Sequence, residues 1–165
     1  MLIRPVLTTD LSAVFQLGTT LFREEDEVPD LRIALRSYDP TRSFVTCCST
    51  DDAEITGFAI VRCGSAGCYE LAFLGVSPHY HGRGIGSRLL RTVLDTLAPT
   101  DFFWLSVDVD NRVARAMYEK VGFQLLETCE GAYPCFRLGY LPPPSSCKKE
   151  NMLPPTPANA IAPVG

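Results

Sequence analysis

The chain has 165 residues, of which 46% are hydrophobic and 21% charged, and its formal net charge at pH 7 is −4. This length and composition predict one soluble domain with a substantial core, and the negative charge disfavours nonspecific nucleic-acid binding. The chain contains no run of about 18 apolar residues, so we expect no membrane span, and we recognise no export signal in its first residues. We expect a cytoplasmic protein, although a nuclear location is also compatible, that binds neither membrane nor nucleic acid.

The N-terminal half alternates short apolar segments with polar turns. It predicts a strand over 2–6, a helix capped by Thr9-Asp10, a second helix over 30–37, and a hairpin of strands over 44–48 and 55–62. The first helix is predicted from apolar residues near the helical period, namely Leu11, Val14, Phe15, Leu17 and Leu21.

The C-terminal half predicts more strands and two further helices. In chain order these are a strand over 69–76, a helix whose apolar stripe runs from Ile85 to Leu97, a strand over 102–109, a helix over 111–121 that ends at Gly122, and strands over 123–128 and 135–140. From residue 142 the composition shifts to Pro, Ser, Lys and Ala, which predicts a domain over 1–141 and a disordered tail over 142–165.

Seven cysteines, an odd number, show no paired Cys-x-x-Cys spacing. This pattern favours free thiols in a reducing compartment, and we expect no metal site. The cysteines are Cys47, Cys48, Cys63, Cys68, Cys129, Cys135 and Cys147.

A glycine-rich turn joins an apolar strand to an amphipathic helix between Gly75 and Leu90. Glycines at 82, 84 and 86 let the backbone approach a ligand closely, and the N-terminus of a following helix favours a phosphate. The turn lacks the Gly-Lys-Ser/Thr end of a P-loop, and its mid-chain place does not fit a Rossmann fingerprint. It predicts a phosphorylated cofactor, with a purely geometric strand-to-helix turn as the alternative.

A second segment extends this interpretation. Val76, Pro78 and the run 81–86 match the first motif of the GNAT superfamily of acetyl-CoA-dependent N-acetyltransferases, and the segment 108–123 contains its second, Asn-x-x-Ala-x-x-x-Tyr-x-x-x-Gly-Phe. That motif is matched at Asn111, Ala114, Tyr118, Gly122 and Phe123. The chain therefore resembles this superfamily from about Met1 to Leu141.

The resemblance implies a single-domain α/β fold with a mixed, mostly antiparallel sheet, splayed at its centre and flanked by helices. It also implies acetyl transfer from acetyl-CoA to a primary amine by direct attack in a ternary complex. The acceptor would be a protein lysine, a protein N-terminus or a small-molecule amine, and the protein a monomer or homodimer. A noncatalytic acyl-CoA-binding regulatory module is the alternative.

The resemblance also assigns cofactor contacts. The pantetheine arm would lie along the backbone of Gly75, Val76 and Ser77, with the Val76 N–H stabilising the oxyanion. Backbone N–H groups would hold the pyrophosphate at Gly82, Arg83, Gly84, Ile85, Gly86, Ser87 and Arg88. Asn111 would contact the pantetheine, cap its helix, or do both. His81 stands where Arg or Gln is more frequent, either as a tolerated substitution or at a cost in cofactor affinity.

Two residues are the catalytic candidates. Tyr118 would protonate the leaving thiolate, with a half-buried packing role as its alternative. Glu70, six residues before Val76 and so expected on the same face of the strand, would be the general base or merely a charge at the sheet edge. Ser106 stands where the ribosomal-protein N-terminal acetylating branch carries a glutamate, and Asp108 or Tyr133 could relay a proton.

Two further features remain. The acidic run 24–27 falls between the first two helices, where the family builds part of its acceptor pocket, and is either a solvated face or an attraction for a cationic acceptor. A cysteine acyl-enzyme on Cys47 or Cys48 is disfavoured, because the only histidines are His79 and His81.

Overall fold

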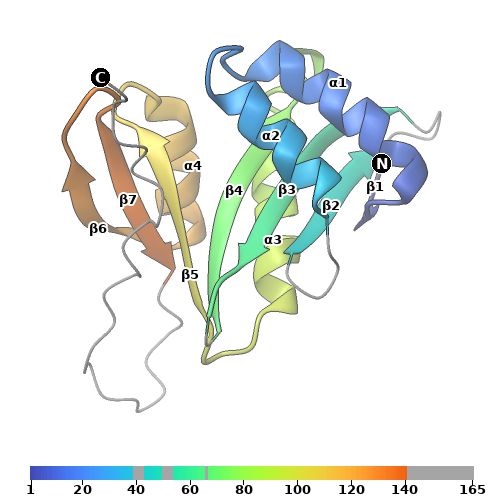
Figure 1. The fold of residues 1–165 in the computed structure, drawn as a ribbon. Coiled ribbons are helices and arrows are strands. Elements are labelled where there is room, and N and C mark those ends of the chain that lie inside the picture. Colours follow the sequence, from blue (N-terminus) through green and yellow to red (C-terminus); the bar gives the residue numbers. More distant parts are fainter. Residues whose placement is uncertain (39–42, 50–53, 66, 141–165) are drawn as a thin grey trace.

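A seven-stranded sheet lies between two pairs of helices in the computed structural model, which describes residues 1–38, 43–49, 54–65 and 67–140 (Figure 1). The strand order is β1-β2-β3-β4-β5-β7-β6, and the pairs are antiparallel except for β4 with β5. The elements of the described part are β1 (Leu2–Pro5), η1 (Thr8–Asp10), α1 (Leu11–Leu21), α2 (Glu27–Arg36), β2 (Ser43–Ser49), β3 (Ile55–Cys63), β4 (Cys68–Val76), η2 (Pro78–Tyr80), α3 (Ile85–Thr96), β5 (Phe102–Asp108), α4 (Arg112–Val121), β6 (Phe123–Cys129) and β7 (Cys135–Tyr140).

The predicted fold class and the order of helices and strands are confirmed, with two local corrections. Helix α2 begins at Glu27 and not at Asp30, because the Asp26 carboxylate accepts the Glu27 N–H at 2.8 Å and caps the helix earlier. Asp10 does not cap α1 with its side chain. Its carboxylate accepts the Leu7 N–H at 2.7 Å and pairs with Arg4 at 2.6 Å.

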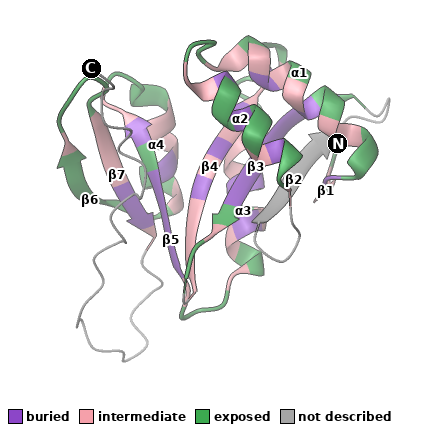
Figure 2. Cartoon of the chain, in the orientation of Figure 1, coloured by how far each residue is buried: buried purple, intermediate pink, exposed green. Residues whose placement is uncertain are grey.

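Each face of the sheet has its own core (Figures 1 and 2). Helices α1 and α2 pack over β3 and β4 through a cluster that includes Val14, Leu31, Phe58 and Phe73. Helices α3 and α4 pack on the other face through a larger cluster, whose fully buried members include Leu89, Leu90, Phe103, Leu105 and Leu138. Strand β6, at the edge, is mostly exposed (Figure 2).

Strands β4 and β5 pair only at their N-terminal ends. Three pairs join them, Cys68 with Phe102, Tyr69 with Phe103 and Glu70 with Trp104, and beyond Glu70 the strands diverge (Figure 1). The splay at the centre of the sheet, expected from the family resemblance, is therefore present.

A β-bulge in β4 overturns one prediction. Ile60 lies opposite Phe73 and Val61 opposite Leu71, so Ala72 is an extra residue in β4. The extra residue reverses the side-chain alternation, and Glu70 consequently faces the α1–α2 side while Val76 packs on the α3–α4 side. The expectation that Glu70 shares the face of Val76 was wrong.

The predicted tail over 142–165 lies outside the described residues. Within the ranges that the structure covers, no helix is long and apolar enough to cross a membrane.

We predict that Leu89→Ala lowers the free energy of unfolding by about 2–5 kcal/mol, because this side chain of α3 is fully buried against the sheet and its removal leaves a cavity. Leu125→Ala is the matched control, since Leu125 in β6 is 50% exposed and its loss should cost less than about 1 kcal/mol. Urea denaturation of both variants measures the difference. Equal losses would contradict the placement of the core.

Candidate active site

The unpaired edge of β4 is the first feature of the site. The Ser77 N–H donates to the Thr56 carbonyl at 2.8 Å, so the backbone groups of the next pair, Gly57 and Val76, point away from each other. By the same alternation the N–H and C=O groups of Leu74 also point toward β5. Because β5 has diverged here, these groups have no strand partner in the described part of the chain. An extended ligand can bond to this edge as an added strand.

His81 fastens the following turn to this edge. Its Nε2 lies 2.8 Å from the Val76 carbonyl oxygen. A carbonyl oxygen has two lone pairs, so this contact still leaves one acceptor position on Val76 for a ligand. His81 thus holds the turn against the end of β4. The sequence, which showed only a histidine where Arg or Gln is more frequent, did not suggest this role.

A row of free backbone N–H groups follows His81. The His81 N–H bonds the Pro78 carbonyl at 3.2 Å and the Arg88 N–H bonds the Gly84 carbonyl at 3.0 Å, but the N–H groups of residues 82–87 have no acceptor within the described ranges. Residues 85–87 form the first turn of α3, where the helix dipole adds positive potential. Consecutive N–H groups at a helix N-terminus form an anion site.

Different physical constraints act on the glycines of this turn. Gly82 and Gly84 have φ values of +74° and +73°, and a Cβ at either would meet nothing within 4 Å. They are needed for the left-handed backbone and leave open space for a ligand. At Gly86 a Cβ would lie 2.9 Å from Met117 Sδ and 3.7 Å from Val76 Cγ2. This glycine allows α3, α4 and the end of β4 to pack closely.

Tyr118 lies in α4 within the same cluster as Val76. Its ring is buried beside Phe123, with ring centroids 5.9 Å apart, and burial raises the pKa of its hydroxyl well above the ordinary value. Among the described residues, Arg137 Nε is the one side-chain polar atom that has neither solvent contact nor a hydrogen-bond partner. The Tyr118 hydroxyl also has no hydrogen-bond partner in the described part of the chain, so it must retain some contact with solvent. Tyr118 therefore keeps its proton near neutral pH.

Asn111 caps α4, as one of its two predicted roles required. Its Oδ1 accepts the Ala114 N–H at 3.1 Å. The amide NH₂ donors of this side chain and the second lone pair of Oδ1 are then left for a cofactor.

Known proteins share this architecture. Residues 11–123 match the family model described as the acetyltransferase (GNAT) family. The chain belongs to the GNAT family. It is 52% identical over 56 residues to an N-alpha-acetyltransferase RimI of Mycobacterium tuberculosis, which covers 34% of this chain and 35% of that protein. It is 35% identical over 103 residues to an uncharacterized N-acetyltransferase of Mycobacterium bovis, which covers 61% of this chain and 62% of the relative.

Solved structures show the same GNAT fold. The ribosomal-protein-S18-alanine N-acetyltransferase of Escherichia coli superposes with a TM-score of 0.73 at 21% identity, over 92% of this chain and 98% of that one. Arabidopsis thaliana NAA60 in complex with a bisubstrate analogue gives a TM-score of 0.70 at 18% identity, over 84% and 96% of the two chains. The chain spans about a third and about three fifths of the length of the two mycobacterial relatives.

Glu70 belongs to the last pair that joins β4 and β5 before the strands separate, and its side chain faces the α1–α2 side of the sheet. Its carboxylate is 3.7 Å from Arg62, and its strand partner is Trp104. Burial raises the pKa of the Glu70 carboxyl, while the charges of Arg62 and Arg137 offset part of the rise. A raised pKa suits a general base near neutral pH.

Arg137 was missed by the sequence analysis. Its guanidinium stacks over Trp104 with 5.2 Å between Cζ and the ring centroid, and its Nη1 donates to Glu127 at 2.7 Å. Opposite Arg137 in the sheet is Ser106, which is exposed. No local pattern marks Arg137, because its role depends on the register of β7 against β5.

Arg23 connects the acidic run 24–27 to the end of β5 and to the β6–β7 loop. Its Nη1 donates to Asp108 at 2.9 Å and its Nε to Asp26 at 3.2 Å, while its Cζ lies 5.0 Å from the centre of the Tyr133 ring. The run 24–27 therefore borders the open end of β5. Arg23 neutralises part of its charge through Asp26 and also Glu27, which is 3.5 Å away. Any electrostatic attraction of the run for a cationic acceptor therefore comes mainly from the exposed carboxylates of Glu24 and Glu25.

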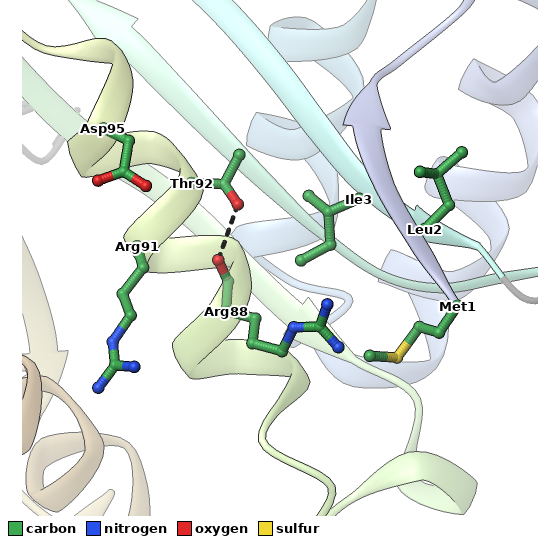
Figure 3. Close-up of a pocket in the computed structure, with 7 residues that line it drawn as sticks. All are labelled: Met1, Leu2, Ile3, Arg88, Arg91, Thr92 and Asp95. Carbon is green, nitrogen blue, oxygen red and sulfur yellow. Dashed lines mark hydrogen bonds between the residues drawn. The ribbon is translucent and has the colours of Figure 1, made fainter.

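Arg88 does not belong to the anion site as predicted. Its N–H is already bonded to Gly84, and its side chain extends toward β1, where it lines a cavity of about 390 Å³ (Figure 3). The other lining residues are Met1, Leu2, Ile3, Arg91, Thr92 and Asp95. This cavity lies between α3 and β1, outside the splay (Figure 3).

We predict that Gly86→Ala and Met117→Ala are coupled. The added methyl meets Met117 Sδ, so Gly86→Ala should be more favourable in the Met117→Ala background by about 0.5 kcal/mol or more. A double-mutant cycle by urea denaturation measures the coupling. Additive effects would contradict the close approach of α3 and α4.

Proposed function

We propose that residues 1–141 transfer an acetyl group from acetyl-CoA to a primary amine of a second substrate. The proposal depends on one observation, the continuity of the unpaired β4 edge with the free N–H groups of residues 82–87. A ligand suited to this surface has an extended, amide-bearing arm that ends in a phosphate anion. Acetyl-CoA has both parts, and the names of the GNAT relatives support the same reaction.

In the proposed reaction the free amine attacks the thioester carbon, a C–N bond forms and the C–S bond breaks. The carbonyl oxygen gains negative charge and requires a donor in the splay. Val76 and Leu74 both present N–H groups there. The leaving sulfur takes a proton, which Tyr118 is placed to supply because burial keeps its hydroxyl protonated.

The positions of Glu70 and Val76 limit where this reaction occurs. They lie six positions apart along the strand, which is roughly 20 Å, so one reacting centre cannot touch both. Leu74 is only about 13 Å along the strand from Glu70. We therefore propose Leu74 as the oxyanion donor if Glu70 accepts the amine proton through water, with Val76 holding the arm.

The acceptor side is the face that carries Glu70, Ser106 and Asp108. We propose a cationic amine as the acceptor, because Glu24 and Glu25 are exposed beside this face and Tyr133 offers an aromatic surface for a cation. The mycobacterial RimI and the Escherichia coli enzyme support a protein N-terminus as one member of this class. A noncatalytic acyl-CoA-binding module remains the alternative, and thiol release in the presence of amines would exclude it.

We predict that acetyl-CoA at about 100 times its Kd stabilises the protein by about 2.7 kcal/mol, and that Gly84→Glu abolishes the effect because the carboxylate enters the anion site. Gly131→Glu is the matched control, since Gly131 also has a positive φ and open space around its Cβ but lies in the β6–β7 loop. Thermal denaturation with and without acetyl-CoA measures both. An undiminished response in Gly84→Glu would refute the anion site.

We predict that Tyr118→Phe lowers turnover on the order of 100-fold and leaves acetyl-CoA affinity nearly unchanged, because the ring still packs but the proton donor is gone. Tyr140→Phe is the control, since Tyr140 packs on the same Phe123 ring at 5.5 Å. Steady-state thiol release and a binding titration separate the two effects. Equal rates for both variants would make Tyr118 a packing residue only.

We predict that Glu70→Gln lowers turnover most below the pKa of the acceptor amine and that high pH partly restores it, because a free amine needs no base. The raised pKa of Glu70 means that wild-type activity falls on acidification at a higher pH than an ordinary glutamate would give. Turnover against pH for both proteins tests this. A loss that is uniform across pH would show that Glu70 positions the substrate.

A further inference from the structure

Two cysteines lie opposite each other at the end of the β6–β7 hairpin. Cys129 is the last residue of β6 and Cys135 the first of β7, and they are direct partners in the antiparallel ladder. Both side chains are half-buried free thiols that a small reagent can reach, and burial and the neighbouring Cys129 thiol raise the pKa of the Cys135 thiol. Nothing in the proposed acetyl transfer uses either sulfur.

The backbone already has the separation that a disulfide requires. Cα atoms of directly opposed antiparallel residues are about 4.5–5.5 Å apart, and a disulfide spans roughly 4.4–6.8 Å. The two cysteines enclose the loop 130–134, so a bond between them needs no movement of any other element.

The register also fixes which of the two antiparallel geometries the cysteines adopt. The Val109 N–H donates to the Pro134 carbonyl at 3.2 Å, so the backbone groups of the next residue, Cys135, point toward β6. Cys129 and Cys135 thus form a hydrogen-bonded pair, the wider of the two antiparallel geometries. The Cα separation of such a pair, about 5.5 Å, is close to the most frequent value in disulfides.

The pair borders the acceptor side of the site. Cys135 is the strand partner of Asp108, and it lies diagonally opposite Ser106 on the same face of the sheet. The enclosed loop carries Tyr133, on which Arg23 stacks, and Arg23 in turn binds Asp108. A bond between the two sulfurs would fix the loop that holds Tyr133.

We propose that Cys129 and Cys135 form a modification site at which a low-molecular-weight disulfide closes an intramolecular disulfide and weakens binding of the amine acceptor. One cysteine thiolate attacks the small disulfide, forms a mixed disulfide and releases one small thiol. The second thiolate then attacks the mixed disulfide and releases the other. The two cysteines lose two electrons, the small disulfide gains them, and the two cysteine protons leave with the released thiols.

The test treats the full-length protein with glutathione disulfide, traps free thiols by alkylation and digests with trypsin. Peptide 121–137 contains Cys129 and Cys135 and no other cysteine, whereas peptide 63–83 contains only Cys63 and Cys68 and serves as the internal control. Cys63 is the strand partner of Tyr69 and not of Cys68, so that pair lacks direct opposition. We expect peptide 121–137 to lose the mass of two hydrogens, reversibly with dithiothreitol, before peptide 63–83 does.

The second measurement is kinetic and depends on the proposed acetyl transfer. Oxidation should raise the KM for the amine by about threefold or more and leave the Kd for acetyl-CoA within about twofold. The double variant Cys129→Ser with Cys135→Ser has neither sulfur, so its KM should not respond to glutathione disulfide, whereas Cys63→Ser should respond like the parent.

Two results would overturn the proposal. One is peptide 121–137 with both thiols free, or each joined to glutathione, after peptide 63–83 has reacted. The other is a closed peptide with an unchanged KM for the amine. If the protein has no turnover at all, the acetyl-transfer proposal fails, while a closed peptide 121–137 still supports the dithiol site.

Discussion

Backbone groups without a strand partner in the middle of the sheet are the constraint on which the rest of this structure depends. A buried N–H or C=O that is left unpaired costs free energy, so a sheet does not open at its centre unless something else bonds to the exposed edges. Here β4 and β5 share three pairs and then separate, and no other described segment pairs with the edge at Leu74 and Val76. The arm of a bound cofactor is the natural partner for that edge.

The surrounding elements keep this gap open. The Leu71 side of β4 and the Val107 side of β5 pack on α3 and α4, so each strand is anchored by its own core contacts even where the two no longer pair. Gly86 lets α3 approach Met117 and Val76, and His81 holds the turn against the Val76 carbonyl. The first turn of α3 therefore meets the end of β4 at a fixed position, and its free N–H groups continue the unpaired edge.

The sequence predicts the local features of this arrangement well, because they depend on neighbours in the chain. The stripe from Ile85 to Leu97, the cap at Asn111 and the glycine-rich turn before α3 all follow from residues within a few positions. The bulge at Ala72 could not be predicted, because it is a property of the register with β3, and so the face of Glu70 was assigned wrongly. Arg23 and Asp108 are 85 residues apart and meet only through the fold.

The most direct measurement of the central claim is amide hydrogen exchange at Leu74 and Val76, followed by NMR with and without acetyl-CoA. The amides of Phe73 and Gly75 point to β3 and should be protected in both states. If the cofactor arm bonds the open edge of β4, exchange at Leu74 and Val76 should slow on adding acetyl-CoA while Phe73 and Gly75 change little. Unaltered exchange at Leu74 and Val76 under saturating acetyl-CoA would contradict this account.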